Sequence, residues 1–298
     1  MAPLKLPRAS HHADGRCELP LLHTAGGLVG GDELDIAIQL EPLSAGLLTS
    51  AAAQKVYGSI GRSRRNPAGI WARQTLTMRL GAGADLEWLP QEMVLYANGL
   101  FEQQARVELE AGASWLGAEV VRLGRTAAGE DLGGGCWRSS LQILRRNATR
   151  SADAGASVDQ WEFVDRIALA GAALRDPHGM DGQPVLGTLV WAAPEPLSSS
   201  DLADLLHNCR LERRGLAGEM ACGALAQGLV ARYRGPSSAA ARWWFTRLWA
   251  RIRAVRGLPP PQPPRVWPFQ EEPLAEDRLA CESDEGFGNG RSPSMAGR

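Results

Sequence analysis

The chain has 298 residues, of which 44% are hydrophobic, and a formal net charge of -1 at pH 7, so it can bury a sizeable core in one large domain or two modest ones. The near-zero charge excludes bulk attraction to nucleic acid or to anionic lipid, because both need a concentrated positive field. No stretch approaches the roughly 20 apolar residues that span a bilayer, and the first ten residues lack the apolar run of a signal peptide, so we expect a cytoplasmic protein.

Alternating apolar residues predict β-strands over the first two hundred residues. The stretch from Leu34 to Leu40 alternates apolar and polar residues, and the stretch from Leu76 to Leu80 does the same, which is the pattern of half-buried strands. Further strand-like runs are 86–89, 93–96, 105–109, 115–123, 137–144, 161–169, 185–191 and 229–233. Glycine-containing turns separate several of these runs, and glycine permits tight reversals of the chain. A mainly β fold is therefore predicted.

Two segments of the chain resemble each other. The sequence from Leu80 to Leu86 is similar to the sequence from Leu109 to Trp115, at a spacing of 29 residues. Two copies are too few to establish a repeat family, but stacked units of a turn followed by a strand would produce such a similarity. The similarity favours layered β coils, in the manner of a β-solenoid or a sandwich.

Two helices are predicted near the C-terminus. The first spans about 200–214, begins at the N-cap pair Ser200 and Asp201, and is closed by Gly215. The second spans about 238–256, starts after Pro236, and ends before Gly257. The β-rich part and both helices are expected to form one domain over 1–267, and 268–298 is expected to be a disordered acidic tail because it is polar and without periodicity.

The second helix carries a dense group of aromatic and basic residues. Four large rings within seven residues exceed what one helix face usually buries, and tryptophan with arginine is the composition of interface hot spots. The residues proposed for partner binding are Trp243, Trp244, Phe245, Arg247, Trp249 and Arg251. The alternative is a solvated helix face, since arginines near a helix C-terminus also suit the helix dipole.

The glycine pairs Gly26-Gly27 and Gly30-Gly31 do not form a phosphate-binding loop. No Gly-Lys-Ser/Thr follows them, and the next segment has a strand pattern rather than a helix whose N-terminus could hold a phosphate. A connection that brings two backbones close together is simpler. Motifs for a serine nucleophile or a zinc protease are also absent from the sequence, and the five histidines are scattered, so no catalytic activity is predicted.

Several carboxylates lie within apolar strands or beside them. Burying a carboxylate is costly unless it is paired, hydrated or in contact with a cation. The candidates are Glu87, Glu92, Glu119 and Asp165. The alternative for each of them is that strand alternation places it on the solvent face.

The segment Leu22-His23-Thr24-Ala25-Gly26-Gly27-Leu28-Val29-Gly30-Gly31-Asp32 resembles the signature of the UreD (or UreH) family of urease accessory proteins. Further blocks follow in the order expected for that family. They are Thr49 to Tyr57, Leu86-Glu87-Trp88-Leu89-Pro90-Gln91-Glu92, Leu123-Gly124-Arg125 with Gly129-Glu130, Pro184 to Leu189, and Pro263-Pro264-Arg265-Val266-Trp267. Together these blocks cover roughly 18–267.

The resemblance implies stacked β-strands with two C-terminal helices and no catalytic activity. It also implies a UreF-like partner, a UreG-like GTPase that carries nickel, and the urease apoprotein as a third partner. Nickel would pass transiently through an internal channel, and no cofactor would be bound permanently. Such a channel needs weak oxygen ligands that exchange readily with water. The candidate residues along the nickel path are His23, Asp32, Glu92, Glu119 and Asp165.

Three features depart from the family pattern. Family members usually have a further strand or two ahead of the segment that resembles Ala2 to Leu6, so the chain is expected to be truncated or to start at a misassigned Met. The family often has a basic residue where this chain has Gly58, which puts a contact at that point in doubt. The acidic tail after Trp267 is unusual and has no assigned role.

Two other functions remain open from the sequence. The first is a hydrolase on a β-solenoid in which Glu87 and Glu92 act as acid and base, although a spacing of five would place them on opposite faces of a regular strand. The second is a β-rich interaction module unrelated to nickel.

Overall fold

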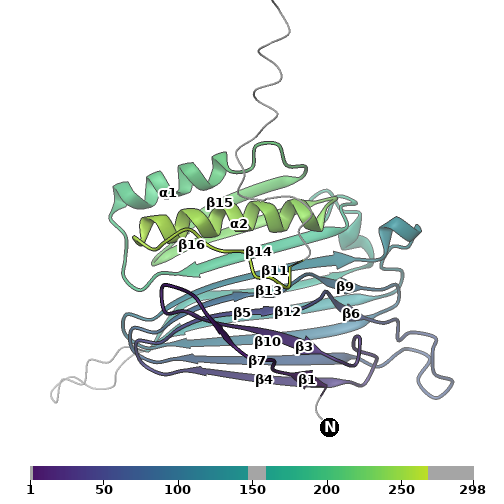
Figure 1. Ribbon diagram of the computed structural model, residues 1–298. Helices are drawn as coiled ribbons and strands as arrows, with labels where there is room; N and C mark the ends of the chain where they lie inside the picture. The colour runs from purple at the N-terminus through teal and green to yellow at the C-terminus, as the bar shows by residue number, and fades with distance from the viewer. Residues whose placement is uncertain (1–2, 147–158, 268–298) are drawn as a thin grey trace, which may run out of the picture.

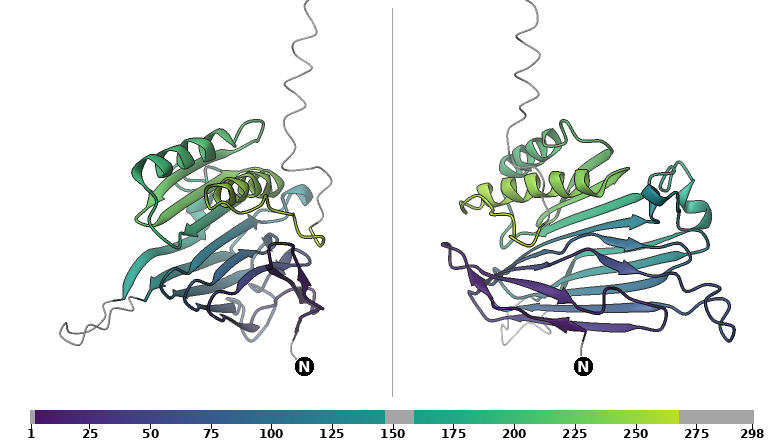
Figure 2. Two further views of the ribbon diagram at one scale, coloured as in Figure 1. Left: turned by 60° about the vertical axis from the view of Figure 1, so that its left-hand side comes forward. Right: turned by 45° about the vertical axis from the view of Figure 1, so that its right-hand side comes forward.

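Two β-sheets stack face to face, and two helices cover one side of the larger sheet (Figures 1 and 2). The computed structural model describes residues 3–146 and 159–267. The larger sheet has the order β1-β3-β5-β8-β11-β14-β16-β15, and the smaller sheet has the order β13-β12-β10-β7-β4. The predicted fold class, mainly β with stacked strands and two helices near the C-terminus, is confirmed.

The larger sheet contains β1 (Leu4–Lys5), β2 (Ser10–His11), β3 (Cys17–His23), β5 (Ala45–Ser50), β6 (Gln54–Val56), β8 (Asp85–Leu89), β9 (Met93–Leu95), β11 (Ser114–Leu123), β14 (Val185–Ala192), β15 (Glu219–Leu225) and β16 (Gly228–Gly235). The smaller sheet contains β4 (Glu33–Leu40), β7 (Ala72–Leu80), β10 (Leu100–Leu109), β12 (Cys136–Arg145) and β13 (Gln160–Ala170). The helices are α1 (Ser199–Leu211) and α2 (Ser238–Val255), with short 3-10 turns at η1 (Thr126–Ala128) and η2 (Gly171–Leu174).

Successive coils of the chain stack in parallel. β7 pairs with β10 so that Leu80 lies opposite Leu109, and β8 pairs with β11 so that Leu86 lies opposite Trp115. These are equivalent positions of the two similar sequence segments. The similarity therefore marks two consecutive coils, each of which runs from the smaller sheet into the larger one. β4 and β5 form the preceding coil, since β4 pairs with β7 and β5 pairs with β8.

The turns between the sheets also stack. The amide of Leu43 donates to the carbonyl of Ala82 at 2.9 Å, and the amide of Gly83 donates to the carbonyl of Ala111 at 2.9 Å. Gly83 and Gly112 both have a positive φ, at 66° and 68°. A Cβ on Gly83 would lie 2.7 Å from Cδ2 of Leu43, so glycine is required there by the backbone conformation and by the close approach of the neighbouring turn.

Both helices occur close to their predicted positions. α1 begins at the N-cap Ser198, two residues before the predicted Ser200, and the Ser198 hydroxyl accepts a hydrogen bond from the amide of Asp201. α2 begins directly after Pro236, as predicted, at the N-cap Ser237, whose hydroxyl accepts a hydrogen bond from the backbone amide of Ala240. None of the helices described is long and apolar enough to cross a bilayer. The predicted tail 268–298 lies outside the described residues.

The aromatic residues of α2 correct the predicted docking surface. Trp244, Phe245 and Trp249 are buried in the core, because α2 contacts α1 with one face and the larger sheet with another. The indole of Trp244 donates to the Cys209 carbonyl of α1 at 3.1 Å, and the indole of Trp249 donates to Glu87 of β8 at 2.7 Å. These three residues are therefore not available on the surface.

Three members of the predicted docking group are less deeply buried. Trp243 and Arg247 are partly buried, whereas Arg251 is exposed over about half of its side chain. Arg247 donates to the carbonyls of Glu212 and Arg214, and Arg251 pairs with the Glu212 carboxylate at 2.6 Å. Both arginines thus tie α2 to the end of α1, and a role in partner binding stays a prediction for these three residues.

Candidate functional site

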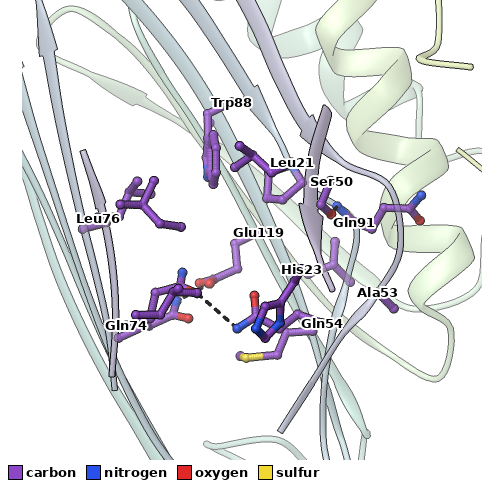
Figure 3. Close-up of a pocket in the computed structure, with 18 of the residues that line it drawn as sticks. Leu21, His23, Ser50, Ala53, Gln54, Gln74, Leu76, Trp88, Gln91 and Glu119 are labelled. Carbon is purple, nitrogen blue, oxygen red and sulfur yellow. Dashed lines mark hydrogen bonds between the residues drawn. The ribbon is translucent and has the colours of Figure 1, made fainter. Parts of the chain in front are cut away.

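A cavity of about 550 Å³ lies between the two sheets (Figure 3). Apolar side chains such as Leu76, Trp88 and Trp115 form part of its wall. The rest of the wall is polar and comes from inward-facing strand positions and from the segment between β5 and β6. The polar lining includes His23, Gln54, Gln74, Gln103, Glu119 and Asp165. An interior of this kind can hold water and a small hydrophilic solute.

Uncharged side chains that carry oxygen atoms form one row across the smaller sheet. Gln74 of β7 lies opposite Gln103 of β10, and Gln103 lies opposite Ser139 of β12. The side-chain amide of Gln54 donates to Oε1 of Gln74 at 3.1 Å, and the side-chain amide of Gln103 donates to the Ser139 hydroxyl at 3.1 Å. The glutamines were not predicted from the sequence, although the coil offset that relates Leu80 to Leu109 also relates Gln74 to Gln103.

Glu119 on β11 projects into the cavity from the opposite sheet (Figure 3). Its carboxylate accepts a hydrogen bond from Gln103. Burial raises the pKa of Glu119 to about 7, while the hydrogen bond from Gln103 and the charge of Arg232 oppose this rise. Glu119 is partly buried and lines the cavity, so water in the cavity can reach its carboxyl. Glu119 can therefore exchange a proton near neutral pH.

We expect the variant Glu119→Gln to be more stable than the parent protein above pH 7 and equally stable near pH 4. The folded protein keeps this proton up to about pH 7, whereas an unperturbed glutamate releases it near 4.5. The stability that the proton supplies is complete below the lower value and is lost as the pH rises through the upper one. The gain at pH 8 should be about 1–2 kcal/mol, because cavity water solvates part of the charge.

Urea unfolding of both proteins at pH 4 and pH 8 measures this difference. The variant Glu102→Gln, on the outer face of β10, serves as the control and should show no such dependence on pH. An equal effect of Glu119→Gln at both pH values would contradict the assignment.

Asp165 on β13 lines the cavity and is held by an arginine. Arg232 of β16 lies 2.5 Å from the Asp165 carboxylate and donates to the Thr188 hydroxyl at 2.5 Å. This ion pair joins the smaller sheet to the larger one. A cation that reaches this end of the cavity therefore meets a carboxylate that is already neutralised by Arg232.

His23 lies in the same cavity, at the end of β3 (Figure 3). Burial lowers the pKa of His23, and the charge of Asp32 opposes this shift only in part. The lowered pKa favours the neutral imidazole, which is the form that binds metal ions. The neighbouring lining residues Thr24 and Gly26 are exposed, so the cavity reaches the surface beside His23.

Asp32 and Glu92 are placed outside the cavity wall, unlike the other three candidates. The Asp32 carboxylate accepts a hydrogen bond from the amide of Val29 at 2.8 Å and closes the turn of the glycine-rich segment. Glu92 pairs with Arg242 of α2 at 3.0 Å. The five candidates for the nickel path thus divide into three cavity residues and two residues with other partners.

The glycine-rich segment is a close-packed β connection. Gly26, Gly27 and Gly31 have positive φ angles of 77°, 146° and 97°, which side-chain-bearing residues rarely adopt. A Cβ on Gly27 would lie 2.7 Å from the Lys55 carbonyl oxygen, and one on Gly30 would lie 2.3 Å from the Ser59 hydroxyl. The glycines therefore allow this segment to approach its neighbours, and Gly26 and Gly27 also line the cavity.

Glu87 and Glu92, considered above as the acid and base of a hydrolase, do not lie on one regular strand. β8 ends at Leu89, so the loop from Pro90 to Glu92 breaks the alternation that would place Glu87 and Glu92 on opposite faces. Both carboxylates pair with arginines of α2, Glu87 with Arg253 and Glu92 with Arg242. Neither carboxylate lines the cavity. Within residues 3–146 and 159–267, no three His, Cys, Asp or Glu side chains form a group that could hold a metal ion.

Comparison with known proteins agrees with the resemblance noted in the sequence. The family model described as UreD urease accessory protein matches residues 1–268. The urease accessory protein UreD of Synechococcus sp. strain WH7805 is 60% identical over 273 residues, which cover 92% of this chain and 84% of that protein. The protein of the same name from Prochlorococcus marinus strain MIT 9303 is 57% identical over 271 residues, or 91% of this chain and 88% of its own length. On the strength of these matches, the chain belongs to the UreD family of urease accessory proteins.

Proposed function

We propose that this protein is a non-catalytic scaffold in the cytoplasm that assists the insertion of nickel into apo-urease. In this role it acts together with UreF-like and UreG-like proteins, of which the second is a GTPase that supplies nickel. The ion is cargo that passes through the cavity and is not a resident cofactor. The family membership supports the link to urease, and the polar cavity between the sheets supports the passage of an ion.

The cavity chemistry is the observation that carries this proposal. Ni²⁺ moving through a protein must replace part of its water shell with ligands that release it again. The row of Gln74, Gln103 and Ser139 offers neutral oxygens, which bind a divalent ion more weakly than a cluster of charged ligands would. Glu119 and His23 line the cavity from different strands (Figure 3), and neither belongs to a group of three His, Cys, Asp or Glu side chains among the described residues. This arrangement suits transit better than capture.

Deletion of the gene in its natural host, followed by complementation, tests the proposal. We expect the deletion strain to make normal amounts of urease apoprotein but to have little urease activity and little nickel in the purified enzyme. The intact chain should restore both. Full activity and nickel content in the deletion strain would contradict the proposal and would favour an interaction module unrelated to nickel.

A further inference from the structure

The larger sheet is interrupted at the same place in two successive coils. β5 ends at Ser50 and β6 begins at Gln54, while β8 ends at Leu89 and β9 begins at Met93. β11 pairs with β8 up to Gly117 and with β9 only from Val121 onward. The backbone from 118 to 120 therefore has no ladder partner on that side. The two breaks form one gap in the sheet, which we call the sheet gap (51–53, 90–92 and 118–120).

The sheet gap separates the main cavity from a second, smaller one. The smaller cavity has a volume of about 20 Å³ and lies under α2, where Arg242, Trp249 and Trp267 contribute to its wall. Three residues at the sheet gap line both cavities, namely Pro90, Ala118 and Val120. The wall between the two spaces is therefore one residue thick.

Arg242 of α2 holds the loop that closes the sheet gap. Its guanidinium donates to Oε1 of Gln91 at 2.7 Å and pairs with Glu92 at 3.0 Å. Gln91 lines the main cavity beside Ser50 (Figure 3), and the Ser50 hydroxyl accepts a hydrogen bond from the Gln91 amide at 2.9 Å. The closing loop is thus fixed by a helix on one side and by the end of β5 on the other.

The segment after α2, residues 258–267, also contacts the loop 90–92. The Gln91 side chain donates to the carbonyl of Val266 at 3.1 Å. The indole of Trp267 donates to the hydroxyl of Thr49 at 2.7 Å, and its ring lies 6.3 Å from the ring of Trp249. We call this segment the C-terminal strap. It connects the end of α2 to both strand ends at the sheet gap.

We propose that the sheet gap is a second opening of the main cavity and that Arg242 and the C-terminal strap are its latch. The proposal rests on the proposed passage of a divalent cation, because a passage needs an exit besides the opening near His23. While the latch is closed, the guanidinium occupies the gap and repels a dication. Once Arg242 is drawn away by an acidic group of a partner protein, the oxygens of Gln91 and Glu92 face the gap and can bind the cation.

Thiol labelling of a cavity residue tests the latch without nickel or urease. Ser139→Cys places a thiol on the inner face of β12, and peptide mass spectrometry follows its modification by a small cationic methanethiosulfonate separately from the native cysteines. In Ser139→Cys combined with Arg242→Ala, we expect labelling to be about tenfold faster, since the lost ion pair and hydrogen bond shift the population toward the open gap.

Two further variants separate the two openings. Arg251→Ala removes an arginine of the same helix that pairs away from the gap, and it should leave the rate unchanged. Thr24→Trp is expected to slow labelling through the opening beside His23, and adding Arg242→Ala should restore it. If Arg242→Ala does not fold, Arg242→Gln replaces it with the same expected rise.

If the labelling rate responds to Thr24→Trp but not to Arg242→Ala, the proposal of a second opening is wrong. A failure of the proposed function looks different, because labelling would still respond to Arg242 while urease activation remained normal without the protein.

Discussion

Replacing both cavity carboxylates, in the variant Glu119→Gln/Asp165→Asn, is expected to lower urease activation at limiting nickel by at least about tenfold. The attraction between two unit charges at 4 Å is about 4 kcal/mol in an effective dielectric of 20, and solvation offsets most of it. A remainder of about 1.4 kcal/mol corresponds to a factor of ten in the occupancy of the cavity by a cation. Asp165→Asn also leaves Arg232 with its charge uncompensated, which should repel the ion further.

Urease activity and nickel content in a reconstituted activation mixture measure this effect. The matched control is Asp35→Asn/Glu102→Gln, which removes the same charge from the outer face of β4 and β10 and should have no effect. Excess nickel should partly restore activity in the cavity variant, because occupancy rises with concentration. Full activation by the cavity variant at limiting nickel would show that the ion does not take this route.

Glu87→Ala should destabilise the protein by about 3–5 kcal/mol, the usual cost of removing one partner from a buried ion pair. Glu87 is fully buried and pairs with Arg253 at 2.9 Å and with Arg16 at 3.4 Å. It also accepts the hydrogen bond from the indole of Trp249 at 2.7 Å. Without the carboxylate, two buried guanidinium groups and an indole N–H lose a partner in the interior.

Thermal unfolding monitored by circular dichroism checks this value, and a fall in Tm of roughly 10 °C is expected for a chain of this size. Glu102→Ala removes a partner of Arg73 on the exposed face and should change stability by less than about 0.5 kcal/mol. Glu87→Gln keeps an acceptor for Trp249, so its loss of stability should lie between those of Glu87→Ala and Glu102→Ala. A similar small change for all three variants would contradict the role of the buried pair.

Alternation and an internal copy of the sequence account for some of the correctly predicted strands. Alternation at 34–40 and 76–80 identified β4 and β7, and the copy at 109–115 favoured the layered coils that the structure contains. β5 was missed because Gly46 to Thr49 are all buried, so its sequence has no alternation to detect. β6 has three residues, Gln54 to Val56, and two of them are polar, so no apolar run marks it.

The candidate site was predicted in part for a clear physical reason. Glu119 and Asp165 are carboxylates within apolar strands, and the cost of burying them made them conspicuous. Gln74 and Gln103 carry no charge and are ordinary on a solvent face, so nothing in their local sequence distinguished them. Glu92 was chosen by the same reasoning as Glu119, but its loop turns it toward Arg242.

The burial of the aromatic residues of α2 could not be predicted from composition. Composition identified a group of rings but could not say how many faces of the helix would be covered. α1 and the larger sheet each take one face, so Trp244 and Trp249 are both buried. A sandwiched helix needs more apolar surface than a helix lying on a single layer.

The C-terminal strap and α2 also determine when folding can be completed. Glu87 meets Trp249 across 162 residues of chain, and Thr49 meets Trp267 across 218. During synthesis on a ribosome, the early coils exist before the helix that supplies the partners of Glu87 has been made. Contacts so distant in sequence form slowly and leave strand surfaces open to aggregation. The nascent β body is thus vulnerable until α2 has been synthesised.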